Sequence, residues 1–368
     1  MFGSCAHREG GRNQSGGPPL VASEARSDHG MVSTGSVEAT QAGVWILEQG
    51  GNAVDAAVAA AFVLAIRKSG DSFGARVVAV PVTLLALNRA LERYGTMDLS
   101  TVLAPAIEIA ERGYRRSPNS VAWTKGYLGE AHAQARAALI TPGRAILETD
   151  LEVKTSVSIL GEHTSQVSVA DTLGNAVSLT QTLCRQYGVK VATPGLGFPY
   201  NSCLEFLDFE NSESPLFLSA RRRYPSGMAP TIFRHNGRLV ILGSAGSDRI
   251  APSVTEVISN IIDRNMDLKA AAVAPRVLWN SAHDPPRVCL GIADPVTTSD
   301  ADRLQGFGFE HMYRLVYPPI PLSDSAFFGG VNAVLYDAAT GIFSGVADPR
   351  RSGYAEGPRA VANPQERP

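Results

Sequence analysis

Two alternating runs of apolar and polar residues form the most regular pattern in this chain of 368 residues. The first covers residues 166–171, QVSVAD, and the second covers residues 176–183, AVSLTQTL, with turn-forming residues between them. A period of two is typical of a strand that turns one face toward a core, so the pattern predicts a β-hairpin. Val167 and Val169 share one face of the first strand. Thr164 lies just before that strand, where a hydroxyl group is well placed for chemistry.

Four helices are expected in the first third of the chain. Apolar positions three and four apart mark residues 37–48, which end at two glycines. Residues 52–66 are almost entirely apolar, so their helix must be buried, and the apolar run is too short to span a bilayer. Residues 83–94 and 98–114 predict two further helices, and Gly113 ends the last one.

The second half of the chain alternates strands with fewer helices. Residues 201–210 predict a strand or loop, whereas residues 228–233 and 238–243 predict a second hairpin. Residues 244–247 then lead straight into a helix at 252–263, and backbone N–H groups at such a junction can bind an anion. Strand pairs with flanking helices predict an α+β fold in which two antiparallel sheets lie between helical layers.

Composition and charge narrow the partners that this chain can have. The hydrophobic content of 44% is enough to bury a sizeable core. A net charge of -2 gives no electrostatic reason to expect nucleic acid or an anionic membrane as a partner. The one dense basic run, residues 221–223, fits a solvated loop or an anion-binding role equally well. Residues 1–29 are polar, which predicts disorder, and they lack the apolar core of a secretory signal. We therefore expect a cytoplasmic protein or a mis-assigned start.

The four cysteines, Cys5, Cys184, Cys203 and Cys289, are far apart in the sequence. No CxxC pair occurs, and no histidine lies near a cysteine at the spacing that metal ligands need. The sequence therefore predicts no metal site and indicates no disulfide framework, and a reducing compartment fits this pattern.

The chain also carries a series of motifs in a particular order. They are VSVAD (167–171), GNAVSLTQTL (174–183), NSCLEFLDF (201–209), RRRYPSGMAPTI (221–232), LGSAGSDRI (242–250) and APR (274–276). Together they resemble the small subunit of the gamma-glutamyltranspeptidase family, whose members are N-terminal-nucleophile hydrolases. Residues 30–61 resemble the beginning of that family's large subunit, and ADPRRSG at 347–353 resembles the family's end. Order and spacing carry this resemblance, which spans roughly residues 30–355.

The resemblance implies a four-layer αββα sandwich of the N-terminal-nucleophile hydrolase type. It divides the chain into a disordered segment (1–29), a large-subunit-like region (30–163), a small-subunit-like nucleophile region (164–357) and a C-terminal tail (358–368). The large-subunit-like region is much shorter than in the family. The glycine-rich segment and arginine-bearing strand expected after the second helix are absent, and so is most of a long helical stretch before Gly161.

The resemblance also assigns roles to individual residues. It implies that the chain cleaves itself between His163 and Thr164, which makes Thr164 an N-terminal nucleophile with its own α-amine as base. The backbone N–H groups of Gly246 and Ser247 would stabilise the oxyanion. Thr182, on the second strand of the hairpin, matches a threonine that hydrogen-bonds the nucleophile. This chemistry requires no cofactor.

The resemblance is weaker at the residues that would recognise the substrate. Ser226 matches the first of two substrate-binding serines, whereas Cys184 stands where the family has an asparagine. The family's ammonium-binding aspartate falls at Phe206, so Glu205 or Asp208 would have to supply the carboxylate. Amide cleavage is therefore a firmer expectation than gamma-glutamyl specificity, because a buried zwitterionic group without partners would cost several kcal/mol.

Two functional hypotheses follow. In the first, the chain is a gamma-glutamyltranspeptidase-like hydrolase or acyltransferase that acts on a small-molecule amide, either a gamma-glutamyl compound or a specialised metabolite. Its assembly would be a heterodimer of its own cleavage fragments or a homo-oligomer. In the second, the chain is a catalytically inactive, truncated relative with a binding role. The shortened middle favours the second hypothesis, and the preserved threonines favour the first.

Overall fold

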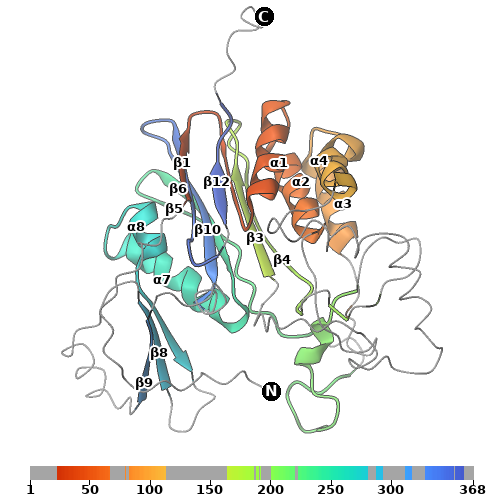
Figure 1. The fold of residues 1–368 in the computed structure, drawn as a ribbon, viewed down its shortest axis with the longest axis vertical. Coiled ribbons are helices and arrows are strands. Elements are labelled where there is room, and N and C mark those ends of the chain that lie inside the picture. Colours follow the sequence, from red (N-terminus) through yellow and green to blue (C-terminus); the bar gives the residue numbers. More distant parts are fainter. Residues whose placement is uncertain are drawn as a thin grey trace, which may run out of the picture.

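A computed structural model describes residues 23–66, 79, 83–112, 164–185, 188–189, 191, 200–219, 223–280, 287–292, 311–316, 328–351 and 353–359. Two sheets lie face to face at the centre of the molecule, and helices cover both outer faces (Figure 1). The predicted α+β class and four-layer αββα arrangement are confirmed. Within the described ranges, no helix is both long enough and apolar enough to cross a membrane.

The four-stranded sheet has the order β12-β2-β3-β4 and contains the predicted hairpin. Its strands are β2 (Met31–Thr34), β3 (Thr164–Ala170), β4 (Ala176–Thr182) and β12 (Tyr354–Glu356). The helices on its outer side are α1 (Val37–Glu48), α2 (Ala53–Ile66), α3 (Thr83–Tyr94) and α4 (Leu99–Arg112). All four helices were predicted from the sequence.

The five-stranded sheet has the order β1-β11-β10-β6-β5 and is antiparallel throughout. Its strands are β1 (Ser23–Ser27), β5 (Thr231–His235), β6 (Arg238–Ala245), β10 (Gly330–Asp337) and β11 (Ile342–Ala347). Helices α7 (Ile250–Ile262) and α8 (Leu268–Val273) cover its outer face, and the β5–β6 hairpin confirms the second predicted hairpin.

Residues 201–210, expected to form a strand or a loop, form a loop with a short 3-10 helix, Cys203–Phe206. The fold differs from the sequence-based expectation in two places. Residues 23–27, expected to be disordered, form β1, which pairs with β11 at the edge of the five-stranded sheet through backbone hydrogen bonds. A third sheet of β7 (Arg276–Asn280), β8 (Arg287–Ile292) and β9 (His311–Val316) includes a parallel pair, β8 and β9. Residues 1–22, the 114–163 stretch and the end of the tail lie outside the described residues.

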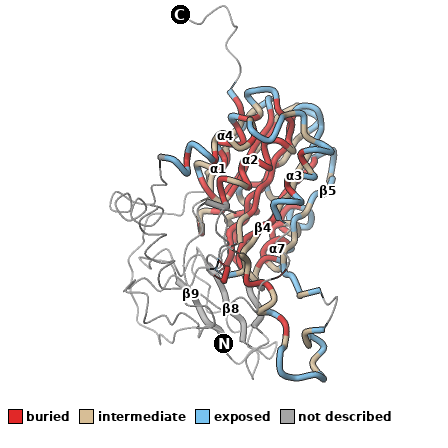
Figure 2. The backbone as a smooth tube through the Cα atoms, turned by 90° about the vertical axis from the view of Figure 1, so that its right-hand side faces the viewer, coloured by how far each residue is buried: buried red, intermediate tan, exposed pale blue. Residues whose placement is uncertain are grey.

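Helix α2 fixes the position of the β3–β4 hairpin. Its apolar side chains are buried against β3, β4 and the neighbouring helices α1 and α4, where Figure 2 shows a dense group of buried residues. The carboxylate of Asp171, in the hairpin turn, accepts a hydrogen bond of 2.8 Å from the backbone N–H of Ala53 at the first turn of α2. Farther along the helix, the Gln181 side chain on β4 donates to the carbonyl of Ala61 over 2.8 Å. Packing and polar contacts at both ends therefore hold the hairpin against α2.

The space between the two sheets is apolar at one end and polar at the other. Met31 and Ala170 of the four-stranded sheet pack against Leu239, Ile241 and Val334 of the five-stranded sheet. Toward the start of β3, the facing residues become glutamine, serine and glycine. A polar end in an otherwise apolar layer is where a reactive group can lie near bound water or substrate.

Candidate active site

Thr164 is the first residue of β3, and Thr182 is the last residue of β4. The two residues are direct partners in the antiparallel register, so their side chains lie on the same face of the sheet. The Thr164 Oγ1 donates a hydrogen bond of 3.2 Å to the Thr182 Oγ1. The backbone N–H of Cys184 donates to that same oxygen over 2.9 Å. The two threonines predicted from the sequence are therefore brought together at the open end of the hairpin.

Gln166 forms a fully buried polar layer beneath Thr164. Its Nε2 donates to the Ser178 Oγ over 2.9 Å and to the Ser168 Oγ over 3.1 Å. Its Oε1 accepts a hydrogen bond of 2.6 Å from the Thr180 Oγ1. Because these side chains come from both strands, the network fixes the relative position of β3 and β4 directly below the nucleophile candidate.

The Gln166 side chain packs against Gly243 of the facing sheet, so closely that an added Cβ at Gly243 would overlap its amide. This contact sets the alignment of β3 with β6. At the other end of the interface, Ala170 packs near Ile241. The segment of β3 from Gln166 to Thr164 therefore runs alongside the segment of β6 from Gly243 to Ala245. The chain turn that follows Ala245 thus lies at the Thr164 end of the sandwich.

That turn consists of Gly246 and Ser247, the two residues predicted to form an oxyanion hole. Both have positive φ angles, 144° at Gly246 and 51° at Ser247. Gly246 also packs tightly against Gly329, whose Cα would lie 2.9 Å from an added Cβ, so glycine is required on two grounds. Consecutive backbone N–H groups in such turns converge on one side and attract anions. The chain then enters α7 through one 3-10 turn, Ser247–Arg249.

Ser226, a predicted substrate-binding residue, lies beside this turn. Its neighbour Gly227 packs against Ser247, whose carbonyl oxygen would be 3.2 Å from an added Cβ. The Ser226 Oγ accepts a hydrogen bond of 3.3 Å from the backbone N–H of Met228 and is exposed. The loop before β5 therefore brings Ser226 to the end of the sandwich where Thr164 and Gly246 lie.

A buried ionic cluster lies behind the Gly246 turn. The Asp348 carboxylate accepts hydrogen bonds from the Arg276 Nη2 over 2.8 Å and from the Arg350 Nη1 over 3.1 Å. The Arg276 Nη1 donates to the carbonyl of Phe328 over 3.2 Å, and the backbone N–H of Asp348 donates to the carbonyl of Val331 over 2.8 Å. The cluster therefore holds residues 328–331, the segment against which Gly246 packs.

The charges of this cluster stabilise one another. Burial alone would raise the pKa of Asp348, but the positive charges of Arg350 and Arg276 outweigh it and hold the pKa below its usual value. Burial lowers the pKa of the Arg276 guanidinium, while the nearby Asp348 charge opposes this shift. Burial also lowers the pKa of Arg351 to about 10. The cluster is therefore charged at neutral pH, with one carboxylate shared by several guanidinium groups.

A model of the gamma-glutamyltranspeptidase family matches residues 39–72, 67–126 and 115–357. The chain belongs to the gamma-glutamyltranspeptidase family. The motifs that resembled this family in the sequence therefore belong to it, and αββα is the fold that the resemblance implied.

Two curated relatives illustrate this membership, and one solved structure shares the fold. The Acylase ACY 1 proenzyme of Pseudomonas sp. (strain V22) is 31% identical over 267 residues, which make up 71% of this chain and 44% of that protein. The glutathione hydrolase proenzyme of Bacillus subtilis (strain 168) is 31% identical over 202 residues, 53% of this chain and 31% of that protein. The chain thus spans less than half the length of these curated relatives. Cephalosporin acylase from Bacillus halodurans has the same fold, with a TM-score of 0.64 at 16% identity, and the match covers 98% of this chain and 100% of that one.

The expectation that the cysteines form no disulfide is wrong. Cys184 and Cys203 are bonded to each other, with their Cα atoms 5.4 Å apart. The loop after β4 folds back on itself, because the backbone N–H of Ser202 donates to the carbonyl of Leu183 over 3.0 Å. Disulfides are typical of oxidising compartments, so the cysteines no longer argue for a reducing one. If Cys184 contacts a substrate as predicted, it does so as one half of a disulfide and not as a free thiol.

The two acidic residues predicted to bind substrate have different surroundings. Glu205 lies beside the end of β4, where its carboxylate forms an ion pair with Arg185. Asp208 follows the 3-10 helix, and its carboxylate accepts hydrogen bonds from the backbone N–H groups of Glu210 and Asn211. These two N–H groups hold the pKa of Asp208 below its usual value. Because Glu205 lies beside the end of β4, it is the better candidate to bind a substrate ammonium group. Asp208 instead stabilises its own loop. His163 lies outside the described residues.

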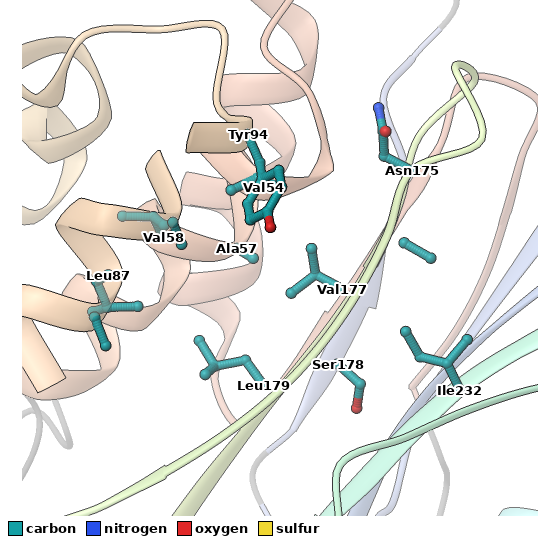
Figure 3. A pocket seen from close by; sticks show the side chains of 13 residues that line it. Val54, Ala57, Val58, Leu87, Tyr94, Asn175, Val177, Ser178, Leu179 and Ile232 are labelled. Carbon is teal, nitrogen blue, oxygen red and sulfur yellow. The ribbon is translucent and has the colours of Figure 1, made fainter. Parts of the chain in front are cut away.

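A separate cavity of about 570 Å³ lies between α2, α3 and β4 (Figure 3). Val54 and Val58 of α2 and Val177 and Leu179 of β4 line it with apolar side chains. It lies along the half of β4 nearest the hairpin turn, whereas Thr182 is at the other end of the strand. The cavity is therefore distinct from the candidate active site.

Sequence reasoning missed several residues that support the site. Gln166 was identified only as the start of a predicted strand pattern, yet its amide connects both strands and the facing sheet. The ionic cluster of Arg276, Asp348 and Arg350 was not predicted, although its residues belong to the APR and ADPRRSG motifs. Charged residues inside otherwise small and apolar motifs are a usable signal for such clusters, because a buried charge requires a partner.

Proposed function

We propose that this chain is a gamma-glutamyltranspeptidase-like hydrolase or acyltransferase that cleaves itself between His163 and Thr164 and then uses Thr164 as its nucleophile. The hydrogen bond from the Thr164 hydroxyl to Thr182 is the observation that carries the proposal. The alignment of Thr164 with the Gly246 turn supports it, because a nucleophile and an oxyanion site must lie at the same end of the sandwich.

Self-cleavage would begin with attack of the Thr164 Oγ1 on the carbonyl carbon of His163. The hydroxyl loses its proton, the peptide C–N bond breaks, and the Thr164 nitrogen takes up a proton and becomes a free amine. The acyl group has then moved from nitrogen to oxygen as an ester. Water hydrolyses the ester, which leaves a carboxylate on His163 and a free hydroxyl and amine on Thr164.

The freed α-amine of Thr164 then acts as the base that a threonine hydroxyl otherwise lacks. Its reference pKa of about 8 lies near neutrality, so it can accept the hydroxyl proton as the oxygen attacks an amide substrate. The backbone N–H groups of Gly246 and Ser247 stabilise the negative charge on the carbonyl oxygen. The leaving amine takes the proton, and water or a second amine releases the acyl group from the threonine.

The substrate class is an amide of a small acyl group. The named relatives include an acylase and a glutathione hydrolase, and both names are consistent with cleavage of amide bonds. Of the predicted binding residues, Ser226 lies beside the Gly246 turn and Glu205 lies beside the end of β4. Because Glu205 already pairs with Arg185, an ammonium-bearing gamma-glutamyl group would have to compete for that carboxylate. A specialised metabolite without an ammonium group is therefore included in the proposal.

Intact-mass spectrometry of the purified chain tests the proposal. We expect two fragments that meet at His163 and Thr164 in the parent chain and in a Thr164→Ser variant, and an uncut chain in Thr164→Ala. Thr172→Ala, an exposed threonine in the turn of the same hairpin, is the matched control and should be cut like the parent. An uncut parent chain would support the alternative of an inactive relative with a binding role.

The pH dependence of turnover provides a second test of the base. Turnover of the cleaved protein should rise as the Thr164 amine deprotonates, with a midpoint near its pKa of about 8. A flat profile between roughly pH 6 and pH 9 would count against the amine as the base.

A further inference from the structure

The Cys184–Cys203 disulfide lies close to the Thr164–Thr182 pair. Cys184 is the second residue after β4, and Cys203 is the buried first residue of the 3-10 helix that follows the loop. Cys184 has a φ angle of 68°, in the left-handed region that a residue with a side chain rarely adopts. The bond joins residues 19 apart in sequence and so fixes both ends of the intervening loop.

The backbone N–H of Cys184 contacts Thr182 directly. It donates a hydrogen bond to the Thr182 Oγ1 over 2.9 Å. The same oxygen accepts the hydrogen bond from the Thr164 hydroxyl over 3.2 Å. A continuous chain of contacts therefore runs from the disulfide through one backbone N–H and one hydroxyl to the proposed nucleophile.

Other contacts would keep the loop folded if the disulfide opened. The backbone N–H of Arg185 donates to the Ser202 Oγ over 3.1 Å, and the N–H of Ser202 donates to the carbonyl of Leu183 over 3.0 Å. The Arg185–Glu205 ion pair joins the same two segments. Loss of the disulfide should therefore alter the local geometry of Cys184 rather than unfold the hairpin.

We propose that the Cys184–Cys203 disulfide is a positioning element for Thr164, and that its reduction slows both self-cleavage and turnover. This inference rests on the proposed function. A dithiol reductant supplies two electrons and two protons: the sulfur–sulfur bond breaks, two cysteine thiols form, and the dithiol becomes a cyclic disulfide. The two unbonded sulfurs must then move apart, which releases the Leu183–Cys184 peptide to turn its N–H away from Thr182.

The expected effect is on the chemical step rather than on substrate affinity. Thr182 would lose the N–H that orients its hydroxyl, and the Thr164 hydroxyl would lose a fixed hydrogen-bond partner. Small misplacements of reacting groups cost up to about 100-fold in rate, so we expect kcat to fall about 10- to 100-fold while KM changes little.

The test uses a full-length Cys5→Ser/Cys289→Ser variant, in which Cys184 and Cys203 are the remaining cysteines. Self-cleavage is followed by intact mass during cell-free synthesis with and without dithiothreitol. Turnover of the cleaved protein is measured with gamma-glutamyl-p-nitroanilide, or with another acyl anilide that the parent hydrolyses. Re-oxidation with oxidised dithiothreitol should restore the rate. Cys203→Ser should be slow without reductant and insensitive to it.

A Thr182→Val variant separates a positioning role from a merely structural one. If the disulfide acts through Thr182, reduction should change the rate of Thr182→Val by less than about twofold, because the acceptor of the Cys184 N–H is gone. An equally large effect of reduction in Thr182→Val and in the parent would overturn the inference.

Three other outcomes of these experiments also test the inference about the disulfide. Equal rates in the oxidised and reduced states would overturn the inference and leave the proposed function standing. Alkylation of both cysteines without prior reduction would show that the bond does not form and would overturn it as well. If neither state cleaves itself or turns over substrate, the proposed function fails and this inference fails with it.

Discussion

Asp348 gives the sharpest test of how the site is supported. An Asp348→Asn variant keeps the shape of the side chain but removes the negative charge shared by Arg276 and Arg350, which are each 2% exposed. Removing one partner of a buried ion pair typically costs about 3–5 kcal/mol, because the remaining charge stays buried without compensation. We expect a loss near the lower end, about 3 kcal/mol, because the asparagine oxygen still accepts one hydrogen bond. A domain of ordinary stability would lose a large share of its free energy of unfolding.

The assay is urea unfolding followed by circular dichroism, with Asp337→Asn as the matched control. Asp337 also pairs with an arginine, since its carboxylate accepts a hydrogen bond of 3.1 Å from the Arg238 Nε. This pair lies at the opposite end of β10 and is partly exposed, so its loss should hardly move the unfolding midpoint. Equal, small shifts in the two variants would refute the reasoning that burial makes the Asp348 charge important.

The pH dependence of stability should report the same group. The pKa of Asp348 is lowered in the folded chain, so the folded state binds fewer protons than the unfolded state in the acid range. Its contribution to stability is therefore fully present above the unfolded pKa of about 3.9 and is lost as the pH falls through the folded value. Between about pH 4 and pH 2, the parent chain should lose stability more steeply than Asp348→Asn. Parallel curves would mean that Asp348 does not titrate as a buried partner of arginine.

Three further variants probe the site itself. Thr182→Val keeps a β-branched strand residue but removes the hydroxyl that pairs with Thr164, so self-cleavage by intact mass should slow by about tenfold or more without loss of fold by circular dichroism. Gly246→Ala forces a side chain into a turn with φ of 144° and against Gly329, so both the melting temperature and the cleavage rate should fall. Gln166→Leu removes the acceptor of the Thr180 hydroxyl and the N–H that donates to the Ser178 hydroxyl, and urea unfolding should show a loss of about 2–3 kcal/mol.

The elements that could be predicted are those whose information is local. Helices α1 to α4 and both hairpins follow from periodicity and turn residues in consecutive stretches of sequence. The hairpin register needed the structure, because a turn at residues 172–175 alone would pair Asp171 with Ala176 and so Thr164 with Leu183. The Asp171 N–H instead donates to the carbonyl of Asn175, so Thr164 opposes Thr182. The contact between these two threonines was implied by the resemblance to the family and not by the hairpin pattern.

The features that could not be predicted depend on segments far apart in the sequence. Arg276 and Asp348 are separated by 72 positions, and no periodicity indicates that they meet. Cys184 and Cys203 come together only because the loop after β4 folds back, and sequence spacing does not specify cysteine pairing. Strand β1 has the polar sequence SEARS, and its strand conformation comes from backbone pairing with β11.

The same distinction bears on whether the shortened chain can still be an enzyme. The described contacts that position Thr164 and Thr182 come from the hairpin itself and from the start of the loop that follows it. Those that hold the Gly246 turn come from residues 328–331 and from the cluster around Asp348. These supports lie outside residues 67–82 and 114–161, where the sequence predicts that the chain is shorter than its family. The shortening should therefore alter the walls that select a substrate more than the machinery that cleaves it, and for this reason we favour a divergent amide hydrolase over an inactive relative.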